Sequence, residues 1–76
     1  MVRVTVYSRP GCRLCEEAMR ELRAAVPGIL VDEVDVDSES SLRDRYGLDI
    51  PVAVENGLEL FRHRFDPACL ALIGKP

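Results

Sequence analysis

Hydrophobic and polar residues alternate at the start of the chain, which reads V-R-V-T-V-Y from Val2 to Tyr7. A period of two with many β-branched residues is typical of a β-strand. From Cys12 or Arg13 to Val26 the apolar residues instead recur every three or four positions, which predicts a helix with one buried face. Pro10-Gly11 predicts a loop before this helix, and Pro27-Gly28 predicts its end. The residues expected on the buried face are Leu14, Cys15, Ala18, Met19, Leu22, Ala25 and Val26.

The middle of the chain predicts a second strand and a short second helix. The segment from Ile29 to Val36 is apolar at first and then reads V-D-V-D. Because one face of its distal end is polar, we expect this strand at an edge of the sheet. Gly47 marks the end of the helix that follows. Its candidate N-caps and core residues are Asp37, Ser38, Ser40, Ser41, Leu42 and Tyr46.

The last third of the chain predicts a hairpin and a final helix. Asn56-Gly57 is a strong two-residue hairpin signal. It separates two predicted antiparallel strands, Ile50 to Glu55 and Leu58 to Arg64. Asp66-Pro67 fits the N-cap and first residue of a helix. The residues expected on one face of this helix are Phe65, Cys69, Leu72 and Ile73.

The predicted element order is therefore β-α-β-α-β-β-α. Its first β-α-β unit should be parallel with a right-handed crossover, and the hairpin adds two strands. We expect an α/β fold in which helices flank a four-stranded mixed sheet. With 76 residues, the chain has room for one domain, residues 1–76.

Composition and charge exclude several classes of function. A hydrophobic content of 47% is too high for a disordered chain, and no apolar run is long enough to span a membrane. A net charge of −3 and few aromatic residues argue against nucleic-acid binding. Three cysteines, with Met1 leading straight into the first apolar run, do not resemble a secreted disulfide scaffold. We therefore expect a cytoplasmic protein whose thiols stay reduced unless they function in redox chemistry.

The chemical signal is the C-x-x-C pair formed by Cys12 and Cys15. A pair that directly follows a strand and opens a helix has both sulfurs within one helical turn. Only Cys12 lies at the helix N-terminus, where free N–H groups and the helix dipole stabilise a thiolate. Arg9 and Arg13 add positive charge nearby. We therefore expect Cys12 to attack a disulfide and Cys15 to resolve the mixed disulfide that forms.

Three other interpretations of the pair remain open. The cysteines could be half of a zinc site completed by His63 and Cys69, although the predicted layout separates these residues from the pair. Both cysteines could be inert core thiols. A dimer could also share an iron–sulfur cluster through Cys12. Taken alone, Cys69 is expected to be a small buried hydrophobic residue, and His63 to belong to a solvated strand end.

The segment Y-S-R-P-G-C-R-L-C, Tyr7 to Cys15, resembles the active-site segment of glutaredoxins. Tyr46-Gly47 followed by Ile50-Pro51 resembles the stretch before the cis-proline of thioredoxins and glutaredoxins. The resemblance covers essentially the whole chain. It implies a thioredoxin-like fold with strand order 2-1-3-4, and the first and last helices on opposite sides of the sheet. It also implies a redox-active Cys12–Cys15 disulfide facing a cis Pro51.

This chain departs from typical glutaredoxins at three places. Arg13-Leu14 replace the Pro-Tyr between the cysteines, and Asp49-Ile50 replace the Thr-Val before the proline. Arg64-Phe65 precede Asp66 where two glycines usually stand. Phenylalanine fills space that a close backbone approach needs, so we expect glutathione to be a poor partner.

The sequence thus predicts a thiol–disulfide oxidoreductase of glutaredoxin-like type, with no cofactor and no metal. Its expected partners are a disulfide-containing protein and either a reductase or a low-molecular-weight thiol. It is expected to act as a monomer, without nucleic acid or membrane. The alternative is a redox-silent docking or metal-handling module on the same fold. Besides Cys12 and Cys15, the residues expected to support the site are Arg9, Pro10, Gly11, Arg13, Leu14, Ile50, Pro51 and Asp66.

Overall fold

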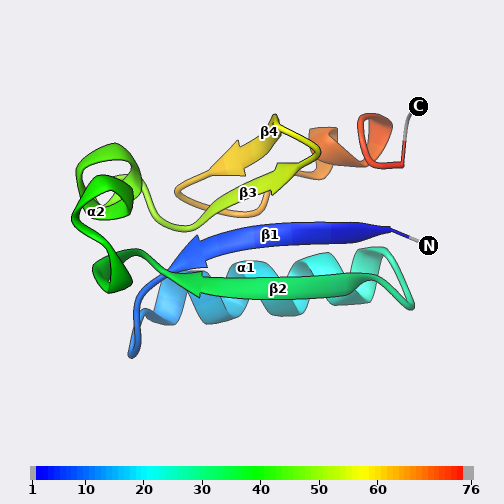
Figure 1. Cartoon of the computed structure of the whole chain (residues 1–76). Coiled ribbons are helices and arrows are strands. Elements are labelled where there is room, and N and C mark those ends of the chain that lie inside the picture. Colours follow the sequence, from blue (N-terminus) through cyan, green and yellow to red (C-terminus); the bar gives the residue numbers. More distant parts are fainter. Residues whose placement is uncertain (1, 75–76) are drawn as a thin grey trace.

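A four-stranded mixed sheet lies at the centre of the computed structural model, which describes residues 2–74. Its strands are β1 (Arg3–Ser8), β2 (Leu30–Asp35), β3 (Val52–Glu55) and β4 (Leu58–Arg62). The strand order is β2-β1-β3-β4, with β1 parallel to β2 and antiparallel to β3 (Figure 1). The expected strand order and the edge position of β2 are thus confirmed.

Helical segments connect and cover these strands. They are α1 (Arg13–Ala25), α2 (Ser40–Tyr46) and two 3-10 helices, η1 (Val36–Ser38) and η2 (Pro67–Ala71). In Figure 1, α1 runs behind β1 and β2, and α2 lies beyond the end of the sheet where β1 finishes. The arrangement is an α/β, thioredoxin-like fold, as the sequence predicts. Within residues 2–74, no helix is both long and apolar enough to cross a membrane.

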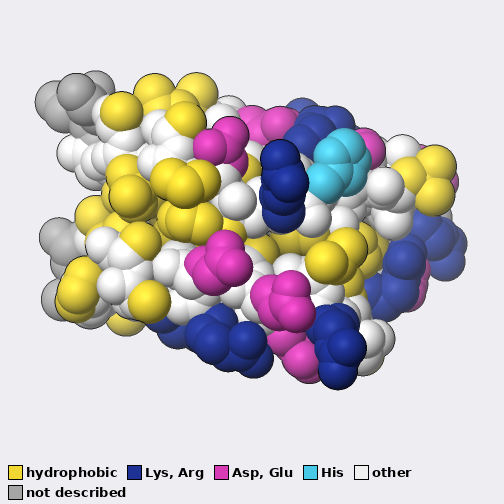
Figure 2. Space-filling view, turned by 180° about the vertical axis from the view of Figure 1, so that it is seen from behind, with side chains coloured by type: hydrophobic (Ala, Val, Ile, Leu, Met, Phe, Trp, Pro, Cys, Tyr) yellow, Lys and Arg dark blue, Asp and Glu magenta, His cyan; other side chains and the backbone are white. Residues whose placement is uncertain are grey.

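The main core lies on the sheet face that carries α1. Val4 and Val6 of β1 are fully buried and pack in one cluster with Cys15 and Leu22 of α1. Cys69 of η2 belongs to the same cluster, so η2 lies on the same face as α1. The expectation that the first and last helices lie on opposite sides is therefore wrong. From this side, hydrophobic side chains form a band between charged ones (Figure 2).

The opposite face of the sheet is only partly covered. Thr5 and Tyr7 point to this face because they alternate with Val4 and Val6 along β1. Helix α2 reaches it through Tyr46, whose ring stacks on Tyr7 with centroids 4.2 Å apart. Between α2 and the β3–β4 hairpin there remains an open hollow of about 500 Å³. The packed core therefore depends on α1 and η2 rather than on α2.

The second strand and the second helix differ from expectation at their junction. Val36 starts a 3-10 helix instead of ending β2, because the Asp35 side chain accepts a hydrogen bond from the Asp37 N–H at 2.8 Å. Helix α2 follows Glu39 and has no side-chain cap. The serines expected as caps are thus not used in that way, and Ser40 begins the helix itself.

Two predicted apolar faces are also smaller than expected. Leu14 is 56% exposed and Ala25 is exposed, because the buried face of α1 consists of Cys15, Ala18, Met19 and Leu22. The last helix is a single short 3-10 segment rather than an α-helix. Leu72 follows this segment and is exposed, whereas Cys69 is buried as expected.

The hairpin forms where the sequence predicts it. Asn56 and Gly57 both have positive φ, 49° and 83°, as a tight two-residue turn between antiparallel strands requires. β3 begins at Val52, after the Ile50-Pro51 turn. β4 ends at Arg62, two residues earlier than predicted, because His63 takes a positive φ of 73° that turns the chain.

Candidate functional site

The loop after β1 brings Cys12 to the start of α1. Gly11 has a φ of 79°, a conformation that residues with a side chain rarely adopt. The Cys12 N–H donates to the Arg9 carbonyl at 3.0 Å, which closes the turn. Cys12 is the N-cap of α1, and its Sγ accepts a hydrogen bond from the Cys15 N–H at 3.2 Å. The sulfur thus takes the place that a serine or aspartate oxygen has in an ordinary N-cap.

Cys12 and Cys15 are joined by a disulfide, with their Cα atoms 5.3 Å apart. The two sulfurs differ in access. Cys15 is 1% exposed and belongs to the main core, whereas Cys12 is only half-buried. An incoming disulfide can therefore reach Cys12 far more easily than Cys15.

The segment around Ile50-Pro51 lies at the same end of the sheet. Tyr7 of β1 is paired with Val52 of β3, so the chain that leaves β1 runs beside the chain that enters β3. The Ile50-Pro51 peptide bond is cis, as the resemblance implies, and Pro51 is fully buried. Ile50 and Cys12 are both half-buried and pack against the same core. The structure thus brings together the two motifs on which the resemblance depends.

The charge of Arg9 is compensated by an aspartate. Its guanidinium binds the Asp37 carboxylate through two hydrogen bonds of 2.8 and 3.2 Å. This contact raises the pKa of Arg9 and lowers the pKa of Asp37. The negative charge of Asp37 therefore offsets part of the positive charge that Arg9 is expected to add near Cys12. Arg13, by contrast, is the first residue of α1 and is exposed.

One contact that the sequence did not predict fixes the end of β1. Ser8 is 1% exposed, and its hydroxyl donates to Glu33 Oε2 of β2 at 2.7 Å. Ser8 and Asp35 are paired in the parallel β1–β2 ladder, with Glu33 two residues earlier. Side chains two residues apart share one face of a strand, so Glu33 lies on the same face of the sheet as Ser8.

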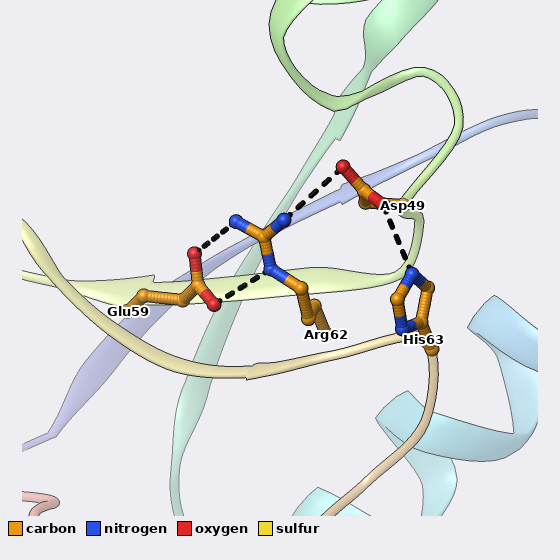
Figure 3. Close-up of polar contacts among 4 residues, drawn as sticks. All are labelled: Asp49, Glu59, Arg62 and His63. Atoms are coloured by element: carbon orange, nitrogen blue, oxygen red, sulfur yellow. Dashed lines mark hydrogen bonds and ion pairs between the residues drawn. The ribbon is translucent and has the colours of Figure 1, made fainter.

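A second unpredicted feature is a polar cluster of Asp49, Glu59, Arg62 and His63 (Figure 3). The His63 N–H donates to the Pro51 carbonyl at 2.9 Å, so the cluster lies beside Pro51. Asp49 accepts hydrogen bonds from Arg62 at 3.1 Å and pairs with His63 Nε2 at 3.0 Å. Arg62 also binds Glu59, which lowers the pKa of that glutamate. The sequence predicts a solvated strand end for His63. It is exposed, but its ring has a fixed partner in Asp49.

The residues expected near glutathione in typical glutaredoxins have structural roles here. Phe65 is half-buried and packs edge-on against Phe61, with ring centroids 5.7 Å apart. The Asp66 side chain caps η2 by accepting from the Ala68 N–H at 2.9 Å. Asp66 is therefore an N-cap, as its position before Pro67 predicts.

The third cysteine lies in the core rather than at the dithiol. Cys69 is a free thiol, 1% exposed. Burial raises the pKa of its thiol, and the nearby charge of Asp66 raises it further. In the part of the chain that the structure describes, no three His, Cys, Asp or Glu side chains come together as metal ligands. Neither His63 nor Cys69 thus joins the pair in such a group.

Comparison with known proteins gives consistent results. The family profile of the glutaredoxin-like domain (DUF836) matches residues 3–72. A protein of Dictyostelium discoideum named "Glutaredoxin-like protein YDR286C homolog" is 29% identical over 73 residues, which are 86% of this chain and 68% of that protein. The "Gene 56 protein" of Mycobacterium phage L5 is 51% identical over 41 residues, 54% of this chain and 38% of that protein.

A solved structure extends the similarity to three dimensions. The X-ray structure of the structural genomics target protein XcR50 from X. campestris has a TM-score of 0.76. It is 33% identical and covers 91% of each chain. The glutaredoxin-like domain and the C-x-x-C pair of Cys12 and Cys15 fit a thioredoxin-fold redox protein. Because the family profile spans nearly the whole sequence, this chain belongs to the glutaredoxin-like family.

Proposed function

We propose that this protein is a thiol–disulfide oxidoreductase that reduces disulfides through Cys12 and Cys15. The observation that carries the proposal is the hydrogen bond from the Cys15 N–H to the Cys12 sulfur at the start of α1. In the reduced protein, the same N–H and the helix dipole stabilise a thiolate at Cys12. The half-buried Cys12 is the attacking sulfur, and the buried Cys15 is the resolving one.

The reaction proceeds in two exchanges. The Cys12 thiolate attacks one sulfur of the substrate disulfide, and the other substrate sulfur leaves as a thiolate that takes up a proton. Cys15 then loses its proton and attacks the Cys12 sulfur, which releases the second substrate thiol. The substrate gains two electrons, and the protein ends as the Cys12–Cys15 disulfide seen in the structure. A dithiol reductase or two equivalents of a low-molecular-weight thiol return it to the reduced form.

The surroundings of the pair support a role for the Ile50-Pro51 segment in holding the substrate. This segment lies at the same end of the sheet as Cys12. The backbone of Ile50 there offers polar groups to an extended peptide, in the manner of strand addition. We propose a disulfide-containing protein as the substrate and a monomeric, cytoplasmic enzyme. Of the supporting residues, Pro10 and Gly11 shape the loop before Cys12. Arg13 and Leu14 are exposed in the first turn of α1, where Arg13 adds a positive charge.

Glutathione is proposed to be a poor electron donor. A tripeptide bound at the start of η2 needs open backbone, but Phe65 fills this place and packs on Phe61. The Asp66 carboxylate, which could otherwise contact the tripeptide, already accepts the Ala68 N–H. The packing of Phe65 and the capping role of Asp66 support this proposal.

The test is a pair of variants in a disulfide-reduction assay. Cys12→Ser should abolish turnover because no attacking thiolate remains, whereas Cys15→Ser should accumulate a mixed disulfide detectable by mass spectrometry. Assays with thioredoxin reductase and with glutathione, run side by side, should show slower turnover with glutathione. Full activity of Cys12→Ser would reject Cys12 as the attacking thiol, whereas an unaltered protein without activity would favour the redox-silent alternative.

A further inference from the structure

The turn from Asp49 to Pro51 is tied to the end of β4 by several hydrogen bonds. The His63 N–H is shared between two carbonyls, that of Asp49 at 3.1 Å and that of Pro51 at 2.9 Å. The Asp49 side chain adds its contacts to Arg62 and to the His63 ring (Figure 3). On its other side, the Asp49 N–H donates to Tyr46 at the end of α2. Asp49 thus connects α2, the turn and β4.

This turn carries Ile50 and lies beside the loop of Cys12. The Tyr7–Val52 pairing places both segments at one end of the sheet. Any shift of the turn relative to β4 moves the Ile50 backbone relative to Cys12. The His63 N–H donates to backbone carbonyls, so these two hydrogen bonds do not depend on any side chain of the turn. The contacts of the Asp49 side chain with Arg62 and His63, by contrast, depend on which residue stands at position 49.

We propose that Asp49 is a positioning residue, which Arg62 and His63 hold so that the Asp49–Pro51 turn presents its backbone to a peptide disulfide. The inference deepens the proposed function, because it names a determinant of substrate recognition at the same site. Asp49 itself does not touch the reacting sulfurs. Its effect is confined to substrates that contact the backbone of the turn.

The charges of the cluster are suited to this role. Arg62 lies between two carboxylates, those of Asp49 and Glu59, and its contact with Glu59 raises the pKa of Arg62. Charge-assisted hydrogen bonds are shorter and more directional than neutral ones. Because the Arg62 guanidinium also contacts Glu59, it holds the Asp49 carboxylate more firmly than an arginine with a single surface contact would.

The chain offers a matched control for the loss of a surface ion pair. Asp32 pairs with Arg3 at 2.9 Å, with the aspartate side chain 47% exposed, on strands β2 and β1. The pair lies toward the start of β1, away from the end that leads to Cys12. Asp32→Asn removes one carboxylate of the same size and charge as Asp49→Asn does.

The experiment compares Asp49→Asn with Asp32→Asn on two substrates, a short peptide disulfide and the small aromatic disulfide dithionitrobenzoate. For the peptide, Asp49→Asn should raise KM about three- to tenfold and leave kcat within about twofold, the scale of a few exposed charged contacts. For the small disulfide, which does not need the backbone of the turn, KM should not change. Alkylation of the reduced Cys12 should be as fast as in the unaltered protein.

A second variant keeps the test valid if Asp49→Asn folds poorly. His63→Asn removes the ring that pairs with Asp49, and asparagine tolerates the positive φ of this position. It should raise KM for the peptide in the same direction. The combined variant should raise KM less than the product of the two single effects, because both changes break one contact.

Two outcomes would overturn the proposal. One is a peptide KM that changes no more in Asp49→Asn than in Asp32→Asn. The other is a parallel loss of activity on both substrates together with slower alkylation of Cys12, which would show a general structural defect. Either result leaves the proposed oxidoreductase activity intact if Cys12→Ser is inactive and Cys15→Ser traps the mixed disulfide. The two proposals can thus fail separately.

Discussion

Cys12 and Cys69 both lie at the start of a helical segment, but their surroundings are opposite. Cys12 is itself the N-cap of α1, and its sulfur accepts the Cys15 N–H. Cys69 is the third residue of η2, where Asp66 is the cap and accepts the Ala68 N–H. Cys12 is half-buried, whereas Cys69 is 1% exposed. Proximity to a helix start is therefore not sufficient to make a thiol reactive.

The two thiols differ in which group accepts the hydrogen bond at the helix start and in their access to solvent. At α1 the sulfur receives the hydrogen bond that the helix start offers, and solvent reaches it. At η2 a carboxylate receives that bond, and its negative charge adds to burial in raising the pKa of the Cys69 thiol. A thiolate at Cys69 would be poorly hydrated and close to a negative charge. Within one small domain, Cys12 thus has the surroundings that its proposed redox role requires, and Cys69 has those of a core residue.

The sharpest test of this contrast is the alkylation of the reduced protein by iodoacetamide at neutral pH. Cys12 should react about a hundredfold faster than Cys69, because it is accessible and its thiolate is stabilised. Mass spectrometry of peptides at successive times would measure both rates. Cys69→Ala should leave the rate at Cys12 unchanged. Equal rates at the two cysteines in the folded protein would remove the basis of the contrast.

The pH dependence of stability tests the Cys69 side of the comparison. Because the folded state raises the thiol pKa, the unfolded state loses this proton first as the pH rises. The contribution of this thiol to stability should be fully present below the ordinary thiol range, and it should fall through that range until the raised folded pKa is reached. The slope is at most about 1.4 kcal/mol per pH unit. Urea unfolding of the oxidised protein at several alkaline pH values would measure it.

Cys69→Ala is the control for this titration. Below the thiol range, the variant should be less stable than the unaltered protein by about 1 kcal/mol, because the sulfur is missing from the core. As the pH rises through the thiol range, its free energy of unfolding should fall less than that of the unaltered protein, because the variant has no thiol at position 69. The oxidised form is used because Cys12 and Cys15 do not titrate when joined in the disulfide. An identical decline in the variant would show that Cys69 is not the group that titrates.

The smallest expected effect concerns the two arginines near Cys12. Arg9 is paired with Asp37, so Arg9→Gln removes one charge of a compensated pair, whereas Arg13 is exposed at the first residue of α1. Arg13→Gln should slow the alkylation of Cys12 about twofold, and Arg9→Gln by less, since solvent and salt screen both charges. Rates at low and moderate ionic strength would measure the difference. A larger effect of Arg9→Gln would show that its pairing does not limit its influence.

Local patterns predicted most of the fold for identifiable reasons. The V-R-V-T-V-Y alternation, the turn at Asn56-Gly57 and the Asp66-Pro67 cap each depend on residues close in sequence. Leu14 was misassigned because helical spacing cannot tell the edge of a buried face from its centre. The last helix was overestimated because a cap and an apolar spacing do not fix its length. The side of the sheet on which it lies depends on Cys69 joining the core cluster that contains Val4 and Val6 of β1.

The candidate site likewise contains some features that the sequence predicts and others that it does not. The sequence predicted the C-x-x-C pair and the Ile50-Pro51 motif, because each is a short segment that can be recognised from neighbouring residues. The pairing of Arg9 with Asp37, the bond from Ser8 to Glu33 and the Asp49–His63 contact could not be recognised in this way. Each joins residues 14 to 28 positions apart, so no local period reveals it.

The sequence alone determined the four strands and the first two α-helices, their order, and the position of Cys12 and Cys15 at the start of α1. These features follow from backbone preferences and hydrophobic periodicity, which act over a few residues. Three features depend on the tertiary structure: which charges are compensated, which thiol is buried and how the Asp49–Pro51 turn is held. Burial and ion pairing depend on what other strands and helices bring to the same place. In this protein the β1–β3 pairing brings the Ile50-Pro51 turn to the same end of the sheet as the Cys12 loop.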